Sequence, residues 1–246
     1  MIELERDGDV CVVRLARPEK LNALSTAVEA ALQDALTSSE VTTSRAVVLT
    51  GDGRAFSAGA DISEFVDRTP ESILAYYRET GAVHERVAAL PQPTLSAIHG
   101  YCLGGGLELA LATDFRIADA TGVFGFPEVG LGILPSSGGT YRVTRLLGAA
   151  KAKELILLRD RLSADDAHAA GLVTEVVPEG EALTRALEHA HRLAALPPAA
   201  VAVIKQSIEA GAESPREAAL LIERLAYGLL SQTEAAQGAA VEFTRR

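Results

Sequence analysis

Two glutamates stand almost alone in apolar stretches of the sequence. Glu108 is the only charged residue within residues 104–113, and Glu128 is the only one within residues 122–132. A helix that is apolar all round is normally buried, so we expect the Glu108 side chain to lie inside the protein. A buried carboxylate needs a partner or has a raised pKa. Carboxylates in such surroundings suit proton transfer to or from a substrate.

A run of three glycines, Gly104 to Gly106, leads into the segment that carries Glu108. It follows the apolar run 94–98, which predicts a buried strand. Glycine allows backbone N–H groups to approach a ligand closely, and the start of a helix favours negative charge. Together with the two glutamates, this turn suits a reaction that forms an enolate-like oxyanion and moves protons beside it.

Each of these features also has an ordinary structural explanation. Glu108 could form a buried salt bridge with Arg116 or Arg142. Glu128 could be a first-turn helix residue that follows a proline and interacts favourably with the helix dipole. The glycines could serve only the close packing of a helix on a strand.

A serine hydrolase is a second chemical interpretation of the sequence. Residues 55–59 imitate the G-x-S-x-G elbow around Ser57, and Asp114 and His168 could complete a Ser…Asp…His order. The serine follows the turn 51–54 and not a strand, which argues against it. The five histidines show no metal-ligand spacing, and neither G-x-G-x-x-G nor a P-loop occurs. We therefore expect no metal site and no nucleotide-phosphate site of those types.

The elements that would position these residues can be read from hydrophobic periodicity. Alternation on both sides of residues 7–9 predicts a β-hairpin. Thr26 and Glu29 match a capping box at the start of a helix that runs to about Ser38. Helical patterns cover 70–90 and most of the chain after Gly138. Further strands are expected at 46–50, 94–98, 115–118 and 172–177. Residues 47–59 and 95–106 share a plan of strand, glycine and small-residue turn, which hints at a repeated ββα module.

Composition limits the class of protein. Of 246 residues, 48% are hydrophobic and 23% are charged, which is typical of a globular chain. With 23 Lys+Arg against 33 Asp+Glu the net charge is −10, so nucleic acid and anionic membranes are not favoured partners. Cys11 and Cys102 are expected to be free thiols in a reducing compartment. With neither a signal-peptide pattern nor an apolar run of about 18 residues, we expect a cytoplasmic protein.

Four motifs, in this order and spacing, resemble the enoyl-CoA hydratase/isomerase (crotonase) family. The resemblance extends through the proline-punctuated helices and covers essentially the whole chain. The motifs are Arg17-Pro18 with Asn22-Ala23-Leu24, the run Phe56-Ser57-Ala58-Gly59-Ala60-Asp61-Ile62, Gly104-Gly105-Gly106 with Glu108-Leu109-Ala110, and Phe124-Gly125 with Pro127-Glu128 and Leu131-Gly132.

The resemblance implies an α/β fold, a crotonase-like spiral of repeated ββα turns with a C-terminal helical trimerisation region. Residues 1–195 would form the spiral core with the CoA-thioester site, and residues 196–246 would form the helical region. The expected assembly is a homotrimer, or a hexamer built as a dimer of trimers. The apolar content after Ala199, such as 220–222, exceeds what one helix face of a small appendage needs.

The resemblance also implies roles for individual residues. The backbone N–H groups of Ala60 and Gly105 would form an oxyanion hole for the thioester carbonyl. Glu108 would orient and deprotonate water, and Glu128 would protonate the α-carbon of a 2-enoyl-CoA. Coenzyme A belongs to the substrate, so no separate cofactor is expected. The residues expected to bind the CoA portion are Lys20, Leu21, Ala58, Ala60, Asp61, Ile62 and Ser63.

Hydration is the activity expected first, and two alternatives stay open. An enoyl-CoA isomerase would use Glu128 as a proton shuttle, and a catalytically idle acyl-CoA-binding or scaffold protein could use the same fold. Ser63 stands where many members of the family have lysine, and Phe126 replaces a common glutamine. These departures bear on the phosphate contacts and on the acyl group accepted.

Overall fold

The structure is a computed structural model that describes residues 1–65, 69–158 and 161–244. It begins with the expected hairpin. Strand β1 (Ile2–Asp7) pairs antiparallel with β2 (Val10–Leu15), with Ile2 opposite Leu15 and Asp7 opposite Val10. Every residue of β2 except Arg14 is buried, which places this strand inside the sheet and β1 at its edge.

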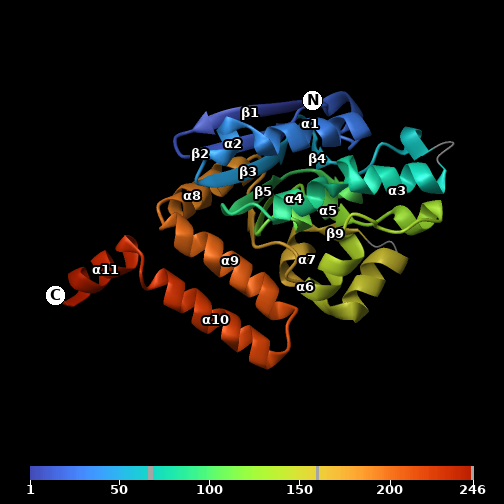
Figure 1. Cartoon of the computed structure of the whole chain (residues 1–246). Coiled ribbons are helices and arrows are strands. Elements are labelled where there is room, and N and C mark those ends of the chain that lie inside the picture. The colour runs from blue at the N-terminus through green and yellow to red at the C-terminus, as the bar shows by residue number, and fades with distance from the viewer. Residues whose placement is uncertain (66–68, 159–160, 245–246) are drawn as a thin grey trace.

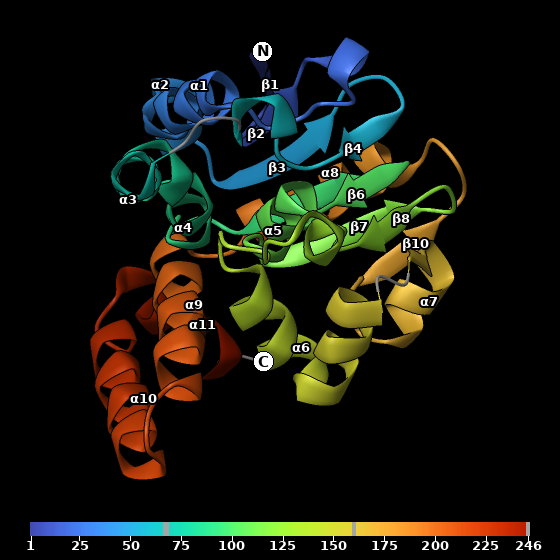
Figure 2. The same ribbon diagram turned by 90° about the vertical axis from the view of Figure 1, so that its right-hand side faces the viewer.

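The chain winds back and forth between two sheets, so that the repeated module expected from the sequence is confirmed (Figures 1 and 2). The large sheet has the order β1-β2-β3-β5-β7-β10, and the small sheet has the order β4-β6-β8-β9. From β2 to β10 neighbouring strands of the large sheet are parallel. The remaining strands are β3 (Ala46–Gly51), β4 (Ala55–Ser57), β5 (Thr94–Ile98), β6 (Tyr101–Leu103), β7 (Phe115–Asp119), β8 (Val123–Gly125), β9 (Leu162–Ser163) and β10 (Glu175–Val177).

Helices connect the strands and pack around the two sheets (Figures 1 and 2). The first six α-helices are α1 (Thr26–Thr37), α2 (Ser39–Thr42), α3 (Pro70–Arg78), α4 (Val83–Ala88), α5 (Gly105–Leu111) and α6 (Gly139–Lys153). They are followed by α7 (Ala164–Ala169), α8 (Ala182–Ala194), α9 (Pro198–Ala212), α10 (Arg216–Leu230) and α11 (Glu234–Thr244). Short 3-10 helices are η1 (Pro18–Lys20), η2 (Ile62–Phe65), η3 (Thr80–Ala82) and η4 (Glu128–Leu131), and η5 (Glu154–Leu158) is a π-helix.

The hydrophobic core has two parts, one on each face of the large sheet. The larger part holds side chains of α1, α4 and α5, including Leu32, Val87 and Leu107. The smaller part lies under α8, which presents an alanine every fourth residue: Ala182, Ala186, Ala190 and Ala194. Small side chains at this spacing form one face of the helix and let it approach the strands closely. The spiral is therefore packed on both sides.

The helices α9, α10 and α11 extend away from the two sheets (Figure 1). They have no buried residue, and large apolar side chains such as Leu225 and Leu229 are 66% and 63% exposed. Lys205 fastens α9 to the core, because its Nζ lies 2.6 Å from Asp114 and donates to the carbonyl oxygens of Leu90 and Gln92. The division of the chain at residue 195 stays a prediction.

Two local predictions were wrong, and a third needs refinement. The N-cap of α1 is Ser25, whose hydroxyl accepts a hydrogen bond from Val28 N, so Thr26 and Glu29 do not form a capping box. The helical pattern over 70–90 is confirmed, but it is divided into α3, η3 and α4, because Glu79 has non-helical angles and Gly81 packs on the ring of Tyr76. The strand expected at 172–177 begins only at Glu175, since the preceding residues close the turn after α7.

Candidate active site

The glycine turn connects β6 to α5 at the centre of the molecule. Gly104 has a φ of 50°, which favours glycine, and its N–H donates to the carbonyl oxygen of Gly125. A β-carbon on Gly104 would lie 2.6 Å from Oε1 of Glu128. A β-carbon on Gly106 would lie 2.6 Å from the carbonyl oxygen of Ser57. Side chains at these positions would therefore displace the second glutamate and the neighbouring strand.

Two backbone N–H groups lie side by side at this turn. Gly59 has a φ of 100°, and a β-carbon there would lie 3.3 Å from Gly105 N. Hydrogen bonds from Leu24 N to Gly59 O and from Asp61 N to Leu24 O hold the chain on both sides of Ala60. Within the described residues, the N–H groups of Ala60 and Gly105 have no acceptor in the protein. The two donors are thus free to bind an oxygen atom of a ligand together.

Glu108 is buried one turn into α5. It is 3% exposed, and its Oε1 accepts hydrogen bonds from Ser137 N at 2.7 Å and Gly139 N at 2.8 Å. Burial raises the pKa of this carboxyl, while the two N–H donors and the positive charge of Arg142 oppose the rise. The carboxylate is held by backbone donors, and the salt-bridge explanation considered from the sequence does not apply.

The two candidate arginines have other partners. Arg116 donates to the carbonyl oxygens of Leu172 and Thr113. Arg142 pairs with Glu85, with 2.6 Å between Nη2 and Oε1. Neither of them forms an ion pair with Glu108 in the part of the chain that the structure describes.

Glu128 faces the same region from the first residue of η4, directly after Pro127. Its Oε2 is buried and has no hydrogen-bond partner among the described residues. Burial, together with the nearby charge of Glu108, raises the pKa of Glu128 to about 7. Near neutral pH this carboxyl is therefore present in both protonation states, which is the condition for a group that gives and takes protons.

The residues predicted to bind the CoA portion come from three adjacent segments. Lys20 and Leu21 end η1, and Ala58 N donates to the carbonyl oxygen of Leu21 at 2.9 Å. Ala60 and Asp61 follow the glycine at 59. The Asp61 carboxylate accepts hydrogen bonds from Arg17 at 3.0 Å and from Ser63 Oγ at 2.6 Å. The Ile62 side chain is 61% exposed. Their role toward CoA stays a prediction.

The hydrolase interpretation is not supported by the geometry. Ser57 Oγ donates to the carbonyl oxygen of Asn22. Asp114 accepts from Thr94 and lies beside Lys205, and the His168 ring bonds to the carbonyl oxygen of Val173. Each of the three side chains is engaged with a different partner, so they do not form a triad.

His84 is a site residue that sequence reasoning missed. It is 1% exposed in α4, and its Nε2 lies 3.3 Å from the carbonyl oxygen of Gly105, the residue that supplies one of the free N–H groups. Burial lowers the pKa of His84 to about 4, so the ring is neutral at physiological pH. Its position between Val83 and the buried Val87, on the apolar side of α4, was the available signal.

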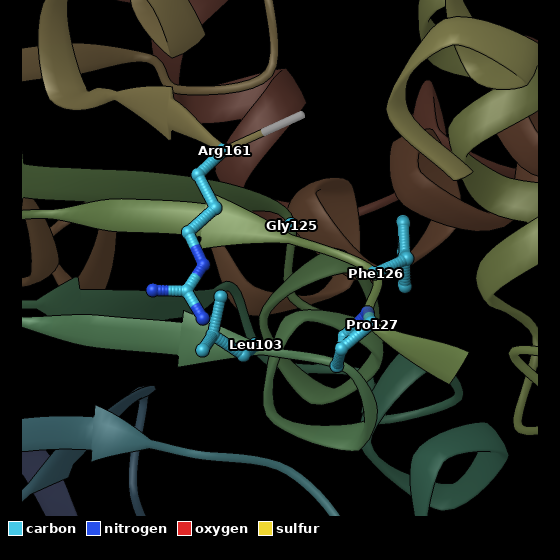
Figure 3. Close-up of a pocket in the computed structure, with 5 residues that line it drawn as sticks. All are labelled: Leu103, Gly125, Phe126, Pro127 and Arg161. Atoms are coloured by element: carbon cyan, nitrogen blue, oxygen red, sulfur yellow. The ribbon is translucent and has the colours of Figure 1, made fainter. Parts of the chain in front are cut away.

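A small cavity lies beside the glycine turn, lined by Leu103, Gly125, Phe126, Pro127 and Arg161 (Figure 3). Arg161 reaches across the strands of the small sheet toward Leu103, and its guanidinium carbon lies 5.9 Å from the centre of the Tyr101 ring. The cavity measures about 40 Å³, which holds no more than a few water molecules. It is too small for an acyl chain.

Within residues 1–65, 69–158 and 161–244 no group of three or more His, Cys, Asp or Glu side chains could hold a metal ion. None of the described helices is both long and apolar enough to span a bilayer.

Comparison with known proteins matches nearly the whole chain to one family. A family model described as enoyl-CoA hydratase/isomerase matches residues 5–244. The short-chain-enoyl-CoA hydratase of Clostridium acetobutylicum is 38% identical over 99% of this chain and 94% of its own length. The 2,3-dehydroadipyl-CoA hydratase of Escherichia coli is 36% identical over 94% and 90% of the two chains.

Solved structures of similar proteins share the whole fold. An enoyl-CoA hydratase from Bacillus anthracis superposes with a TM-score of 0.91 at 37% identity, covering 100% of this chain and 96% of that one. A protein from Rhodopseudomonas palustris described as a putative enoyl-CoA hydratase gives a TM-score of 0.94 at 32% identity, covering 99% and 94%. Because the family model matches residues 5–244, nearly the whole sequence, this chain belongs to the enoyl-CoA hydratase/isomerase family.

Proposed function

We propose that this protein is an enoyl-CoA hydratase, which adds water across the α,β double bond of a 2-enoyl-CoA thioester. The observation that carries the proposal is the meeting of the buried Glu108 carboxyl and the half-buried Glu128 carboxyl beside the free N–H groups of Ala60 and Gly105. Names of relatives such as the Clostridium enzyme support the same activity.

The paired N–H groups would bind the thioester oxygen. Both donors belong to backbone held by other hydrogen bonds, so they need little reorganisation when charge develops on that oxygen. Polarisation of the carbonyl makes the β-carbon electrophilic. As water adds there, negative charge grows on the oxygen, and one preorganised donor is worth about 3–4 kcal/mol in the transition state.

The two glutamates would divide the proton transfers. Both hydrogen bonds to Glu108 go to Oε1, so Oε2 is left to accept a proton from the attacking water. The water oxygen bonds to the β-carbon, and its proton passes to Glu108. Glu128 in its protonated form then gives a proton to the α-carbon, and the enolate returns to a carbonyl. A proton transfer from Glu108 to Glu128, directly or through solvent, would restore the starting state.

Double-bond isomerisation is the competing activity within the family. It needs one carboxyl to move a proton along the acyl chain, a role that Glu128 with its pKa of about 7 could fill alone. The hydrogen-bonded placement of Glu108 favours hydration, because an isomerase has no use for a second carboxylate held against the site.

A labelling experiment separates these activities. With a trans-2-enoyl-CoA in ¹⁸O-labelled water, we expect the label on the β-carbon as a hydroxyl group. A shifted double bond without label at every chain length tried would point to an isomerase. If no product forms while a CoA thioester still raises the melting temperature, the chain is an idle acyl-CoA-binding or scaffold protein.

We further propose a homotrimer, or a hexamer made of two trimers, formed through α9 to α11. Exposed apolar side chains on these helices, such as Ile208 and Leu225 at 63% and 66%, support it. Light scattering at micromolar concentration should show the oligomer, and a monomer would contradict the proposal. We also place the enzyme in the cytoplasm. Its two buried free cysteines agree with a reducing compartment. We expect the acyl-CoA thioester as its partner and no further cofactor.

A further inference from the structure

Arg142 lies directly behind the loop that holds the Glu108 carboxylate. Its Nη1 donates to the carbonyl oxygen of Ser137 at 3.1 Å, and its backbone N donates to the carbonyl oxygen of Gly138 at 2.8 Å. Its Nη2 lies 2.6 Å from Oε1 of Glu85 in α4. The Arg142 side chain is only 12% exposed. It therefore ties α6, α4 and the 137–139 loop together.

A single stretch of backbone, residues 137–139, separates the Arg142 guanidinium from the Glu108 carboxylate. On one side, the N–H groups of Ser137 and Gly139 donate to Glu108. On the other side, a β-carbon at Gly138 would lie 2.0 Å from Arg142 Nη1, so the guanidinium packs against bare backbone. Gly138 also has a φ of 98°, which favours glycine. A shift of Arg142 would therefore move the donors that hold Glu108.

The positive charge of Arg142 acts on the same carboxylate through this loop. It lowers the pKa of Glu108 against the rise caused by burial, and it helps to keep His84 neutral. The helices packed against α5 carry titratable or charged side chains at His84, Glu85 and Arg86 in α4 and at Tyr141, Arg142, Arg145, Lys151 and Lys153 in α6, while Cys102 lies in β6 and Glu128 in η4. Arg142 is the one whose charge favours the ionised form of Glu108.

We propose that Arg142 is a positioning residue, which acts through the Ser137–Gly139 loop to hold the Glu108 carboxylate ionised and in place for the attack of water. This inference rests on the proposed hydratase reaction. Arg142 does not touch the reacting atoms itself. Its planar, forked guanidinium suits the task, because it binds Ser137 and Glu85 in two directions at once.

The test uses Arg142→Gln in the full-length protein with a trans-2-enoyl-CoA. We expect kcat to fall by about 10- to 100-fold, as for a misplacement of about 1 Å. Binding of a saturated acyl-CoA should change by less than about threefold, because the N–H pair at the glycine turn stays intact. The acid limb of the kcat–pH profile should move to higher pH, since Glu108 loses the charge that favours its ionised form.

Two further variants complete the experiment. Arg142→Lys keeps the charge and loses the fork, so its acid limb should lie near that of the wild type while kcat stays reduced. If Arg142→Gln does not fold, a wild-type kcat in Arg142→Lys would overturn the positioning role, because loss of the fork would then have no effect. Arg185→Gln is the matched control, because it removes an exposed arginine of α8 that pairs with Glu175 of β10 and Glu188 of α8. Its kcat and pH profile should equal those of the wild type.

The possible outcomes are distinct. A folded Arg142→Gln protein with wild-type kcat and an unmoved acid limb would overturn the positioning role. A folded Arg142→Gln protein with a reduced kcat but an unmoved acid limb in its kcat–pH profile would also overturn it, because loss of packing alone explains that result. Failure of the wild-type protein to hydrate any enoyl-CoA would instead overturn the proposed function.

Discussion

Glu108 and Glu128 reach the same site from segments that are built differently. Glu108 lies in a helix in which every residue from Gly105 to Leu111 is buried, and two backbone donors hold one of its oxygens. Glu128 begins a helix of four residues that contains no buried residue, and its Oε2 has no partner among the described residues. One carboxylate is fixed by its surroundings, and the other is constrained mainly by the turn that carries it.

This difference shows how one kind of side chain can serve two roles. Hydrogen bonds from Ser137 and Gly139 and the charge of Arg142 favour the ionised form of Glu108, which suits a base. Burial without a comparable partner raises the pKa of Glu128 to about 7, which suits an acid at neutral pH. Pairs of carboxyl groups whose environments separate their pKa values commonly divide acid and base work in this way.

Removing each carboxylate in turn should have the largest effect and tests whether Glu108 and Glu128 act as base and acid. We expect Glu108→Gln and Glu128→Gln each to lower kcat for hydration by about 10³-fold, within the range for general acid–base groups. The double variant should lose little more, because residues that act as a unit are not additive. Steady-state hydration kinetics measure this, with Glu5→Gln at the exposed edge strand as control. If the protein instead shifts the double bond, the rate of that shift should be severely reduced in Glu128→Gln and only mildly reduced in Glu108→Gln.

A second variant tests whether turnover at the two carboxylates requires the Ala60 N–H that is proposed to bind the thioester oxygen. Ala60→Pro removes an N–H that has no acceptor in the described protein, so the fold should persist. Loss of one oxyanion donor should lower kcat by about 10²- to 10³-fold. Turnover is measured alongside circular dichroism. Near-wild-type turnover in a folded protein would show that Ala60 does not bind the thioester oxygen.

The buried surroundings of the glycine turn include His84, and we expect this residue to make the free energy of unfolding depend on pH. Its pKa is lowered to about 4 in the folded state, so between pH 7 and pH 5 the unfolded chain takes up the proton and the folded protein does not. The free energy of unfolding should therefore fall with decreasing pH by about 2 kcal/mol through this group alone.

Replacement of His84 by glutamine isolates that contribution. The Gln amide can still donate to the carbonyl oxygen of Gly105 but does not titrate. Urea unfolding at pH 7 and pH 5, at one protein concentration, should show a smaller loss for His84→Gln than for the wild type. Glu128 opposes His84, because its raised pKa stabilises the folded state as the pH falls, but it does so equally in both proteins. An identical pH dependence in both would rule out the His84 effect.

The smallest expected effect concerns how strongly the two carboxyl groups influence each other. Because the charge of Glu108 helps to raise the pKa of Glu128, Glu108→Gln should lower that pKa. The decrease should be smaller than the rise caused by burial, which is the larger contribution. Carbon-13 NMR titration of labelled glutamate measures it. An unchanged value would mean that the two groups titrate independently.

Local patterns predicted the parts of the fold that depend on near neighbours in the chain. The hairpin, the buried strands and the burial of Glu108 follow from alternation and from apolar runs. Partners distant in sequence were not readable. Thr26 does not cap its own helix, and its hydroxyl donates to Glu64, which lies 38 residues later.

The candidate site shows the same limit. Glycines and isolated carboxylates marked the turn and both glutamates, because those residue types are chemically distinctive. The donors that hold Glu108 are backbone N–H groups of residues 137 and 139, and a backbone group leaves no signature in the sequence. The two arginines considered as its salt-bridge partners bind other groups: Arg116 donates to a carbonyl oxygen, and Arg142 pairs with Glu85.

The strand order of the two sheets has a consequence for how this chain is made. In the order β1-β2-β3-β5-β7-β10, and likewise β4-β6-β8-β9, every new strand lies beside one that is already complete. No strand has to be inserted between two earlier ones. In a chain emerging from the ribosome, the partner of each new strand has therefore already been synthesised, because synthesis runs from the N-terminus. In the proposed oligomer, the exposed apolar side chains of α9 to α11, which have no buried residue within this chain, would be covered only after a second subunit is made.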